Sequence, residues 1–231
     1  MRYAIITGAM GLGNLDMRMV IVNFVTLVLS ICVHEFGHAF VADRLGDSLP
    51  RRQGRVTLNP LVHADPIGTI ALPLFMLIFS GTIGFAWGKP VQVQPAAMTR
   101  KLRMRTAHLF VAIAGPCMNV LFAVVLGLVT FFLVRTSVVS PYSDIYPALL
   151  SAIFMNCILA FFNLIPAPPL DGGTVLEGLL PTRALPTFYK LAPYGVLVLI
   201  AVLAIPQIRA IFTVPAGHLT QAICRLFGLP T

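Results

Sequence analysis

Three side chains suited to metal chemistry stand together in the sequence HEFGH, residues 34–38. His34 and His38 are four positions apart, so a helix places both imidazoles on one face, where they can bind the same ion. Imidazole nitrogens are common zinc ligands, and Glu35 directly follows the first histidine, where its carboxylate can reach a water molecule on the metal. The spacing therefore predicts two zinc ligands, His34 and His38, and a general base, Glu35.

A third ligand is expected elsewhere in the chain, because a catalytic zinc usually has three protein ligands and one open position. The candidates are His63, His108 and Asp171. Asp171 is favoured, since it follows an apolar segment interrupted by prolines and precedes Gly172 and Gly173, which let backbone pack closely. The alternatives are that Asp171 only caps the next helix, that His63 is a loop residue and that His108 is interfacial.

The segment that carries HEFGH is unusually apolar. The chain is 58% hydrophobic and only 10% charged, with a mean hydropathy of +0.89, whereas soluble domains carry about 25% charged residues. An ionisable side chain in a membrane costs roughly 3 kcal/mol on insertion scales unless it is paired or liganded. We therefore predict an all-α polytopic membrane protein in which this polar cluster has a function.

Hydropathy and length predict about five to six transmembrane helices. The apolar segments cover residues 19–42, 67–86, 107–134, 145–165 and 188–206, and a mixed tail follows, which is either an interfacial helix or a last span. No polar stretch is long enough for a separate module. We expect a single domain over residues 1–231, with a core at about 19–180, a C-terminal helix or helices at 188–228, and no PDZ or CBS module.

Two stretches look extended rather than helical: GRVTLNP at 54–60 and GFAWGKPVQVQPAAM at 84–98. Extended backbone at membrane depth needs protein or water around it, so the second stretch predicts a membrane-re-entrant, β-like segment. Its residues Val91, Gln92 and Val93 are candidates for binding an extended substrate by strand addition. The alternative is that they only support the fold.

Three motifs together resemble the site-2 protease family of intramembrane zinc metalloproteases: HEFGH, GPCMN at 115–119 and NLIPAPPLDGG at 163–173. The stretches GRVTLNPLVHADPIGTI and FAWGKPVQVQP resemble its compact bacterial and archaeal branch, and the resemblance covers about residues 19–180.

The resemblance implies that the two histidines and Asp171 bind one Zn²⁺ ion and that Glu35 is catalytic. It also implies that Asn163 handles substrate, and it places Asn119 at the asparagine of the GPxxN motif, where it could hold substrate backbone. Hydrogen bonding between helices is the alternative for both asparagines. The implied partners are single-pass transmembrane protein substrates and the lipid bilayer.

A shared ion also constrains the topology, because His38 and Asp171 both lie at the C-terminal ends of apolar segments. Their helices must run in the same direction, so a passage is needed besides 67–86 and 107–134, and the segment 84–98 can provide it. The chain has 16 basic residues and a net charge of +8. With this topology, most of the basic residues between Arg44 and Arg105 would lie on one side of the membrane. The positive-inside rule makes that side cytoplasmic, and it explains the charge without nucleic acid. We expect the active site toward the cytoplasmic side of the inner or plasma membrane.

Two other functions fit part of the pattern. A transporter or metal carrier also uses discontinuous helices and intramembrane acids, but it leaves Glu35 between the two histidines unexplained, and no inverted repeat is visible in the sequence. A catalytically silent family member is the second alternative, and the intact Glu35 argues against it. The sequence assigns no oligomeric state.

Overall fold

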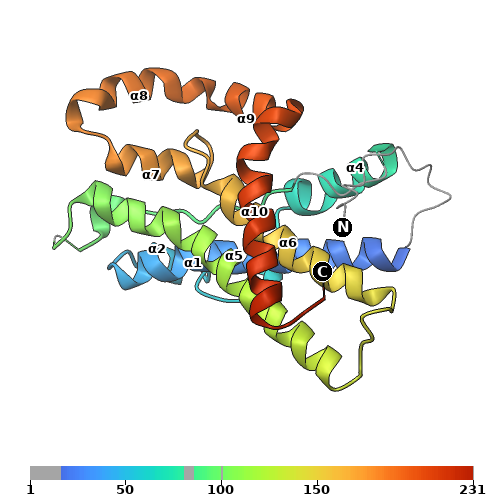
Figure 1. Ribbon diagram of the computed structural model, residues 1–231. Helices are drawn as coiled ribbons and strands as arrows, with labels where there is room; N and C mark the ends of the chain where they lie inside the picture. Colours follow the sequence, from blue (N-terminus) through green and yellow to red (C-terminus); the bar gives the residue numbers. More distant parts are fainter. Residues whose placement is uncertain (1–16, 81–85, 100, 231) are drawn as a thin grey trace.

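The computed structural model describes residues 17–80, 86–99 and 101–230, and these residues form helices and connecting segments without a β-strand (Figure 1). The long helices are α1 (Met17–Arg44), α5 (Met104–Arg135), α6 (Ile145–Asn163) and α10 (Pro206–Leu226). The short helices before α5 are α2 (Leu49–Arg52), α3 (Pro60–His63), the π-helical turn η2 (Pro66–Ala71), α4 (Leu72–Ser80) and η3 (Pro95–Ala97). Those after α6 are α7 (Asp171–Leu179), η4 (Thr182–Ala184), α8 (Leu185–Leu191), η5 (Ala192–Tyr194) and α9 (Gly195–Ala204). The predicted all-α class is confirmed.

Four helical segments of the described residues are long and apolar enough to cross a membrane: α1, α5, α6 and the run Thr182–Ala204, which joins η4 to α9. This is fewer than the five to six predicted. The expected span at 67–86 contains a π-helical turn and the nine-residue α4, and residues 81–85 lie outside the described residues. The tail forms α10, whose 21 residues include Arg209, His218 and Arg225 and are therefore less apolar than the other long helices.

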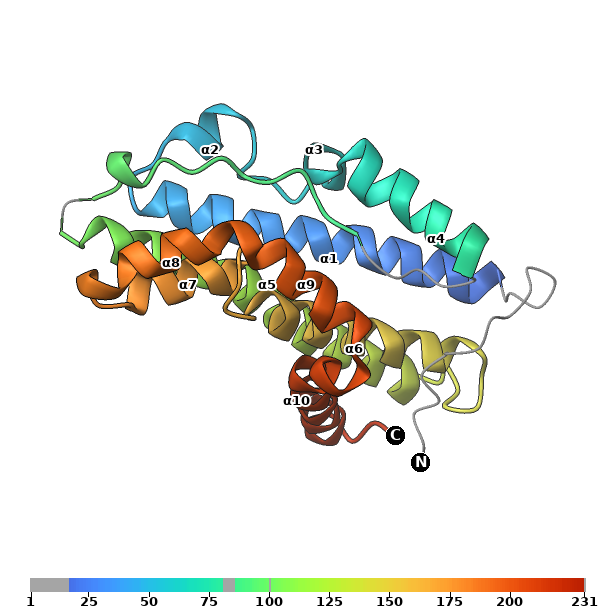
Figure 2. The same cartoon turned by 90° about the horizontal axis from the view of Figure 1, so that it is seen from above.

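Helices α1, α5 and α6 pack side by side, with α7 against α5 and α10 across α6 (Figure 2). Figure 2 shows that α1 and α6 run in the same direction and that α5 runs opposite to them. That is the arrangement expected if the end of α1 and the segment after α6 share one metal ion.

Small residues allow α1 and α5 to approach closely. Ala39, Ala42 and Ala107 are completely buried, and a Cβ atom at Gly37 would lie 2.7 Å from the carbonyl oxygen of Ala114 on α5. Small residues at helix interfaces are the usual means of close packing in membranes, where helices gain little from hydrophobic burial. The close approach brings the histidine-bearing face of α1 directly onto α5.

The chain returns from the end of α4 to the start of α5 through residues 86–94, called here the return segment. It is drawn out alongside α1 (Figure 2) and has no regular secondary structure. The Lys89 N–H donates to the His63 carbonyl at 2.8 Å, and the Gln94 N–H donates to Asp47 Oδ2 at 2.5 Å.

The predicted extended conformation agrees with residues 86–94, but the β-like character is wrong for them, because the described neighbours offer single acceptors rather than another strand. Of the same predicted stretch, Pro95–Ala97 form the 3₁₀ turn η3 instead, and residues 84–85 lie outside the described residues. Residues 54–59, also predicted to be extended, are not helical, and Pro60 begins α3. As predicted, the return segment leads the chain back so that α5 runs opposite to α1 (Figure 2). That the segment re-enters the membrane stays a prediction.

Candidate metal centre

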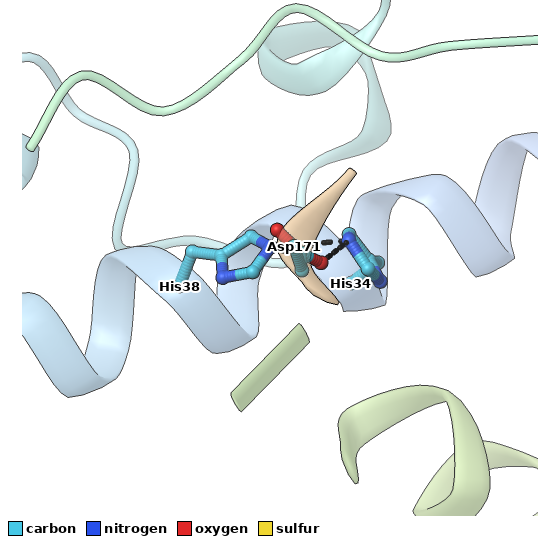
Figure 3. Close-up of side chains that lie close together, drawn as sticks. All are labelled: His34, His38 and Asp171. Carbon is cyan, nitrogen blue, oxygen red and sulfur yellow. Dashed lines mark hydrogen bonds and ion pairs between the residues drawn. The ribbon is translucent and has the colours of Figure 1, made fainter. Parts of the chain in front are cut away.

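Three side chains from two distant parts of the chain converge beside α1 (Figure 3). The Nε2 atoms of His34 and His38 lie 3.0 Å apart, and Asp171 Oδ2 lies 3.1 Å from the first and 3.3 Å from the second. Among the described residues, this is the group of histidine, cysteine and acidic side chains whose ligand atoms could hold a metal ion. His34, His38 and Asp171 are the three ligands that the sequence predicted.

The hydrogen bonds of the two rings determine which nitrogen atoms face the centre. His38 Nδ1 lies 2.8 Å from the Val111 carbonyl oxygen, which can only accept, so Nδ1 carries the proton. His34 Nδ1 lies 2.7 Å from Asn119 Oδ1 and donates in the same way. In the neutral tautomers, both Nε2 atoms then present lone pairs to each other and to a carboxylate oxygen. Such a cluster of acceptors requires a cation.

The spacing and the atom types both fit zinc. Zinc–ligand distances of about 2.0–2.1 Å in a tetrahedron give ligand atoms roughly 3.3 Å apart, and the three observed separations are 3.0, 3.1 and 3.3 Å. Asp171 Oδ2 is also buried without a hydrogen-bond donor among the described residues. Two imidazoles and one carboxylate leave a fourth position open, as in catalytic zinc sites.

Asn119 on α5 holds His34 in place and is itself held on both sides. It is completely buried, and its Nδ2 donates to the Ser30 carbonyl and to Asn156 Oδ1, both at 3.1 Å. These two acceptors fix the amide so that Oδ1 faces His34. Asn156 in turn donates to the Ala152 carbonyl at 3.0 Å. The network links α1, α5 and α6 and gives the His34 ring one orientation.

Asp171 reaches the histidines from the first position of α7, directly after the loop that joins α6 to α7. Gly172 and Gly173 pack against this loop, since a Cβ at either position would clash with backbone atoms of residues 164–168. Leu170, not Asp171, is the N-cap of α7, so the capping alternative is wrong. An aspartate binds a metal ion as its carboxylate.

Glu35 points toward the return segment. Its Oε2 accepts a hydrogen bond of 3.1 Å from the backbone N–H of Val91. A Cβ at Gly88 would lie 2.5 Å from Ile31 Cγ2 and 3.4 Å from Glu35 Cγ, so a larger residue there would push the segment off α1. The return segment thus touches the predicted general base directly.

Glycine is also required on the α5 side of the centre. A Cβ at Gly115 would collide with the imidazole rings of His38 and His34. This explains in physical terms why the GPCMN stretch lies opposite HEFGH: its glycine makes room for the two rings, and its asparagine orients one of them.

The other predicted residues lie outside the group of three. His63 is fully buried, donates from Nε2 to the Thr57 carbonyl at 2.9 Å, and has a pKa lowered by burial. His108 lies on the second turn of α5 and is also not in the group. Asn163 donates to the Leu159 carbonyl of its own helix at 3.0 Å. Neither histidine is a ligand in this arrangement.

The predicted substrate-binding residues of the return segment face different neighbours. Gln92 Oε1 accepts a hydrogen bond from Gln53 Nε2 at 2.8 Å, and Val93 packs against the cluster around Ala42 and Met98. The backbone of Val91 is used by Glu35. Their roles toward a substrate stay predictions.

The fold and the centre together define a multi-pass membrane protein with a His–His–Asp metal site and an adjacent glutamate. The family model "Peptidase family M50" matches residues 22–144 and 136–205. The chain therefore belongs to peptidase family M50, the site-2 protease family, which confirms the predicted resemblance.

Similar proteins carry names that agree with the site. The chain is 33% identical over 189 residues to "Putative zinc metalloprotease YwhC" of Bacillus subtilis, which covers 79% of this chain and 80% of that protein. It is 32% identical over 185 residues to "Putative zinc metalloprotease Rip2" of Mycolicibacterium smegmatis, covering 80% of this chain and 67% of that protein. "Zinc metalloprotease MJ0392" of Methanocaldococcus jannaschii is 28% identical over 163 residues, which are 69% of this chain and 34% of that protein. No solved structure gives a significant match. This protein is a zinc metalloprotease.

Proposed function

We propose that this zinc metalloprotease hydrolyses peptide bonds within or near the transmembrane segments of single-pass membrane proteins, as a step of regulated intramembrane proteolysis. The depth of the centre supports the proposal. Helix α1 ends at Arg44, and His38 and His34 precede this end by 6 and 10 residues, or roughly 9 and 15 Å at about 1.5 Å per residue. A bilayer core is about 30 Å thick. The scissile bond must therefore come into the membrane to reach the centre.

The protein's own residues bind the metal and move the proton. Bound zinc supplies Lewis acidity, which polarises a carbonyl and lowers the pKa of a water molecule toward about 7. The Nε2 atoms of His34 and His38 and the Oδ2 atom of Asp171 would hold the ion. Glu35 Oε2 accepts a hydrogen bond from the Val91 N–H, and the Glu35 carboxylate would accept the proton of the attacking water. The same carboxyl then protonates the leaving amine.

The return segment is suited to receive an unwound substrate. A transmembrane helix must lose backbone hydrogen bonds before it is cut, and the freed groups need new partners. Lys89 and Val91 turn their N–H groups toward the protein, to the His63 carbonyl and to Glu35. Among the described residues, the backbone N–H and C=O of Gln92 make no hydrogen bond, so both groups are available to a substrate. A substrate strand added there would lie beside the base.

The membrane side is proposed from charge. Helix α2 and the start of α5 lie at the same end of the molecule (Figure 2), and that end carries Arg51, Arg52, Lys101 and Arg103. The positive-inside rule makes this the cytoplasmic side of the inner or plasma membrane. A cysteine introduced at Arg103 should react with an impermeant thiol reagent only after the membrane is opened. Reaction in intact cells would contradict the orientation.

The proteolytic function is tested by Glu35→Gln, with Glu177→Gln as the matched control on α7. Both proteins are assayed for zinc content and for cleavage of a single-pass test substrate in proteoliposomes. We expect Glu35→Gln to keep one zinc ion per chain and to lose cleavage by about 10²-fold or more, since general acid–base catalysis contributes about 10²–10⁴-fold. Glu177→Gln should cleave normally. Cleavage that survives Glu35→Gln would contradict the proposed mechanism.

A further inference from the structure

An open cavity of about 580 Å³ lies beside the return segment, away from the metal ligands. Its lining consists of Gln53, Arg55, Lys89, Pro90 and Gln92. Two of these side chains are cationic, two carry neutral amides, and none is acidic. The proteolytic mechanism uses no side chain of this lining to bind metal or move a proton.

Arg55 has the features of an incomplete ion-binding site. It is only 6% exposed, yet within the described part of the chain no carboxylate oxygen lies within 4.0 Å of its guanidinium nitrogens. Its Nη1 donates to the Val62 carbonyl at 2.7 Å and to the Lys89 carbonyl at 3.3 Å. Two neutral carbonyls do not neutralise a buried cation, and buried charges in proteins are normally paired.

The unused edge of the guanidinium has the geometry that binds oxyanions. The two bonds of Arg55 occupy Nη1, so Nε and Nη2 remain, and they form the planar fork that binds carboxylate or phosphate side-on. Arg51, four residues earlier, shows this use of the fork: its Nε and Nη2 hold the two oxygens of Asp43 at 2.8 and 2.5 Å. Arg55 has the same fork and no carboxylate in it.

Lys89 adds a second cation at the same cavity. Its side chain is exposed and makes no hydrogen bond or ion pair with the described residues, while its backbone is fixed by His63 and Arg55. Gln53 and Gln92 are joined by a hydrogen bond of 2.8 Å across the lining. The cavity thus offers two positive charges, one buried and one exposed, and the two charges suit a group bearing more than one anionic oxygen.

We propose that this cavity binds a phosphate group, with its oxygens on the Nε–Nη2 fork of Arg55 and on the Lys89 ammonium. The group can come from the headgroup of an anionic phospholipid or from free phosphate. Because Arg55 also holds the Lys89 carbonyl, and Val91 two residues later donates to Glu35, a bound phosphate would fix the return segment beside the base. The binding itself does not depend on the proteolytic function.

The test uses the full chain and three variants. Lys89→Gln removes one cation and leaves both backbone hydrogen bonds, so it should fold even if Arg55→Gln does not. Arg52→Gln removes an exposed cation of α2 near the same end and is the charge-matched control. Native mass spectrometry after release from nanodiscs of phosphatidylcholine, with or without phosphatidylglycerol, counts retained lipid. Titration calorimetry with inorganic phosphate, on protein in neutral detergent, measures binding from solution.

Each outcome decides the proposal. A lipid source is supported if wild type and Arg52→Gln each retain one phosphatidylglycerol and Lys89→Gln retains it about tenfold or more weakly. A hydrogen bond to a charged group is worth at least such a factor. The same pattern with inorganic phosphate alone supports a soluble source. If wild type binds neither probe, or if Lys89→Gln binds like wild type, the proposal is overturned. If neither probe binds and the Lys89→Gln substitution slows cleavage of acidic substrates but not of neutral ones, the cavity binds a substrate carboxylate instead, and the proposal is likewise overturned.

Discussion

Replacing Asn119 by leucine tests whether this residue orients a metal ligand or holds substrate. Leucine has the same branched arrangement of heavy atoms as asparagine, with two methyl groups in place of the amide oxygen and nitrogen, but it neither accepts nor donates hydrogen bonds through its side chain. The variant removes the acceptor of the 2.7 Å bond from His34 Nδ1 and also the two bonds to Ser30 and Asn156. The His34 ring then loses the contact that sets its tautomer and its rotation.

The size of the effect follows from the buried N–H that is left without a partner. An unsatisfied buried donor costs about 1–3 kcal/mol, which corresponds to roughly 5- to 150-fold in an equilibrium constant. Loss of the hydrogen-bond partner of a ligating histidine typically weakens metal binding about 10- to 100-fold. We therefore expect Asn119→Leu to raise the dissociation constant for zinc about 10- to 100-fold.

The assay is competition for zinc between the purified protein and a fluorescent chelator in detergent. Asn163→Leu is the matched control, because Asn163 donates only to its own helix, and its zinc affinity should stay within about threefold of wild type. If Asn119→Leu binds zinc as tightly as wild type but cleaves the test substrate poorly, the orienting role is refuted and the predicted substrate role is favoured.

Three further changes probe other parts of the structure. Gly115→Ala places a methyl group against the His38 and His34 rings and should weaken zinc binding about 5- to 150-fold, since overpacking costs about 1–3 kcal/mol. Gly217→Ala, at a glycine with open space around it, should bind zinc normally in the same competition assay. Val91→Pro removes the N–H donor to Glu35 and should lower kcat at least about tenfold with unchanged zinc content, whereas equal kcat for Val91→Pro and Val91→Ala would disprove a role for this bond. Burial lowers the pKa of His63, so below about pH 6.5 the unfolded chain binds more protons at this residue than the folded chain does. The free energy of unfolding should therefore decrease as the pH is lowered through this range. Thermal unfolding between pH 5 and 8 should show a weaker pH dependence for His63→Phe, and identical slopes would contradict the assignment.

The group of side chains that could hold a metal ion was predictable from sequence, because most of its signals are local. A spacing of four on a helix puts His34 and His38 on one face whatever the rest of the fold does. Asp171 was harder, since an aspartate before a helix often caps it, and only its combination with the histidines favoured the ligand role. The requirement that both sites share one ion also gave the relative direction of α1 and α6.

The contacts around the ligands were less predictable because they depend on backbone groups. Glu35 is touched by the N–H of Val91, and His38 by the carbonyl of Val111, and neither interaction leaves a trace in the side-chain sequence. Asn119 and Asn156 did carry a signal, because a buried amide in an apolar helix needs a partner, but its identity depends on how three helices pack. The partner of Asn119 is His34, one of the predicted ligands.

Residues 54–59 and 86–94 were interpreted correctly as non-helical, whereas Pro95–Ala97 form a 3₁₀ turn and the β-like character predicted for the second stretch is wrong. Alternation of Val and Gln at residues 91–94 is typical of a strand with one buried face. In the structure this alternation has another cause: the backbone is fixed by single acceptors on α1 and on the α3 region, and no second strand is present among the described residues. Alternation alone does not distinguish these two cases.

The central claim is that His34, His38 and Asp171 together bind one zinc ion. X-ray absorption spectroscopy at the zinc edge of the purified, zinc-loaded protein tests it most directly. We predict a first shell of nitrogen and oxygen atoms at about 2.0–2.1 Å, multiple scattering from two imidazoles, and no sulfur. Asp171→Ala should lose the protein carboxylate oxygen and bind zinc more weakly. A sulfur atom at about 2.3 Å, or a spectrum and affinity unchanged in Asp171→Ala, would contradict the claim.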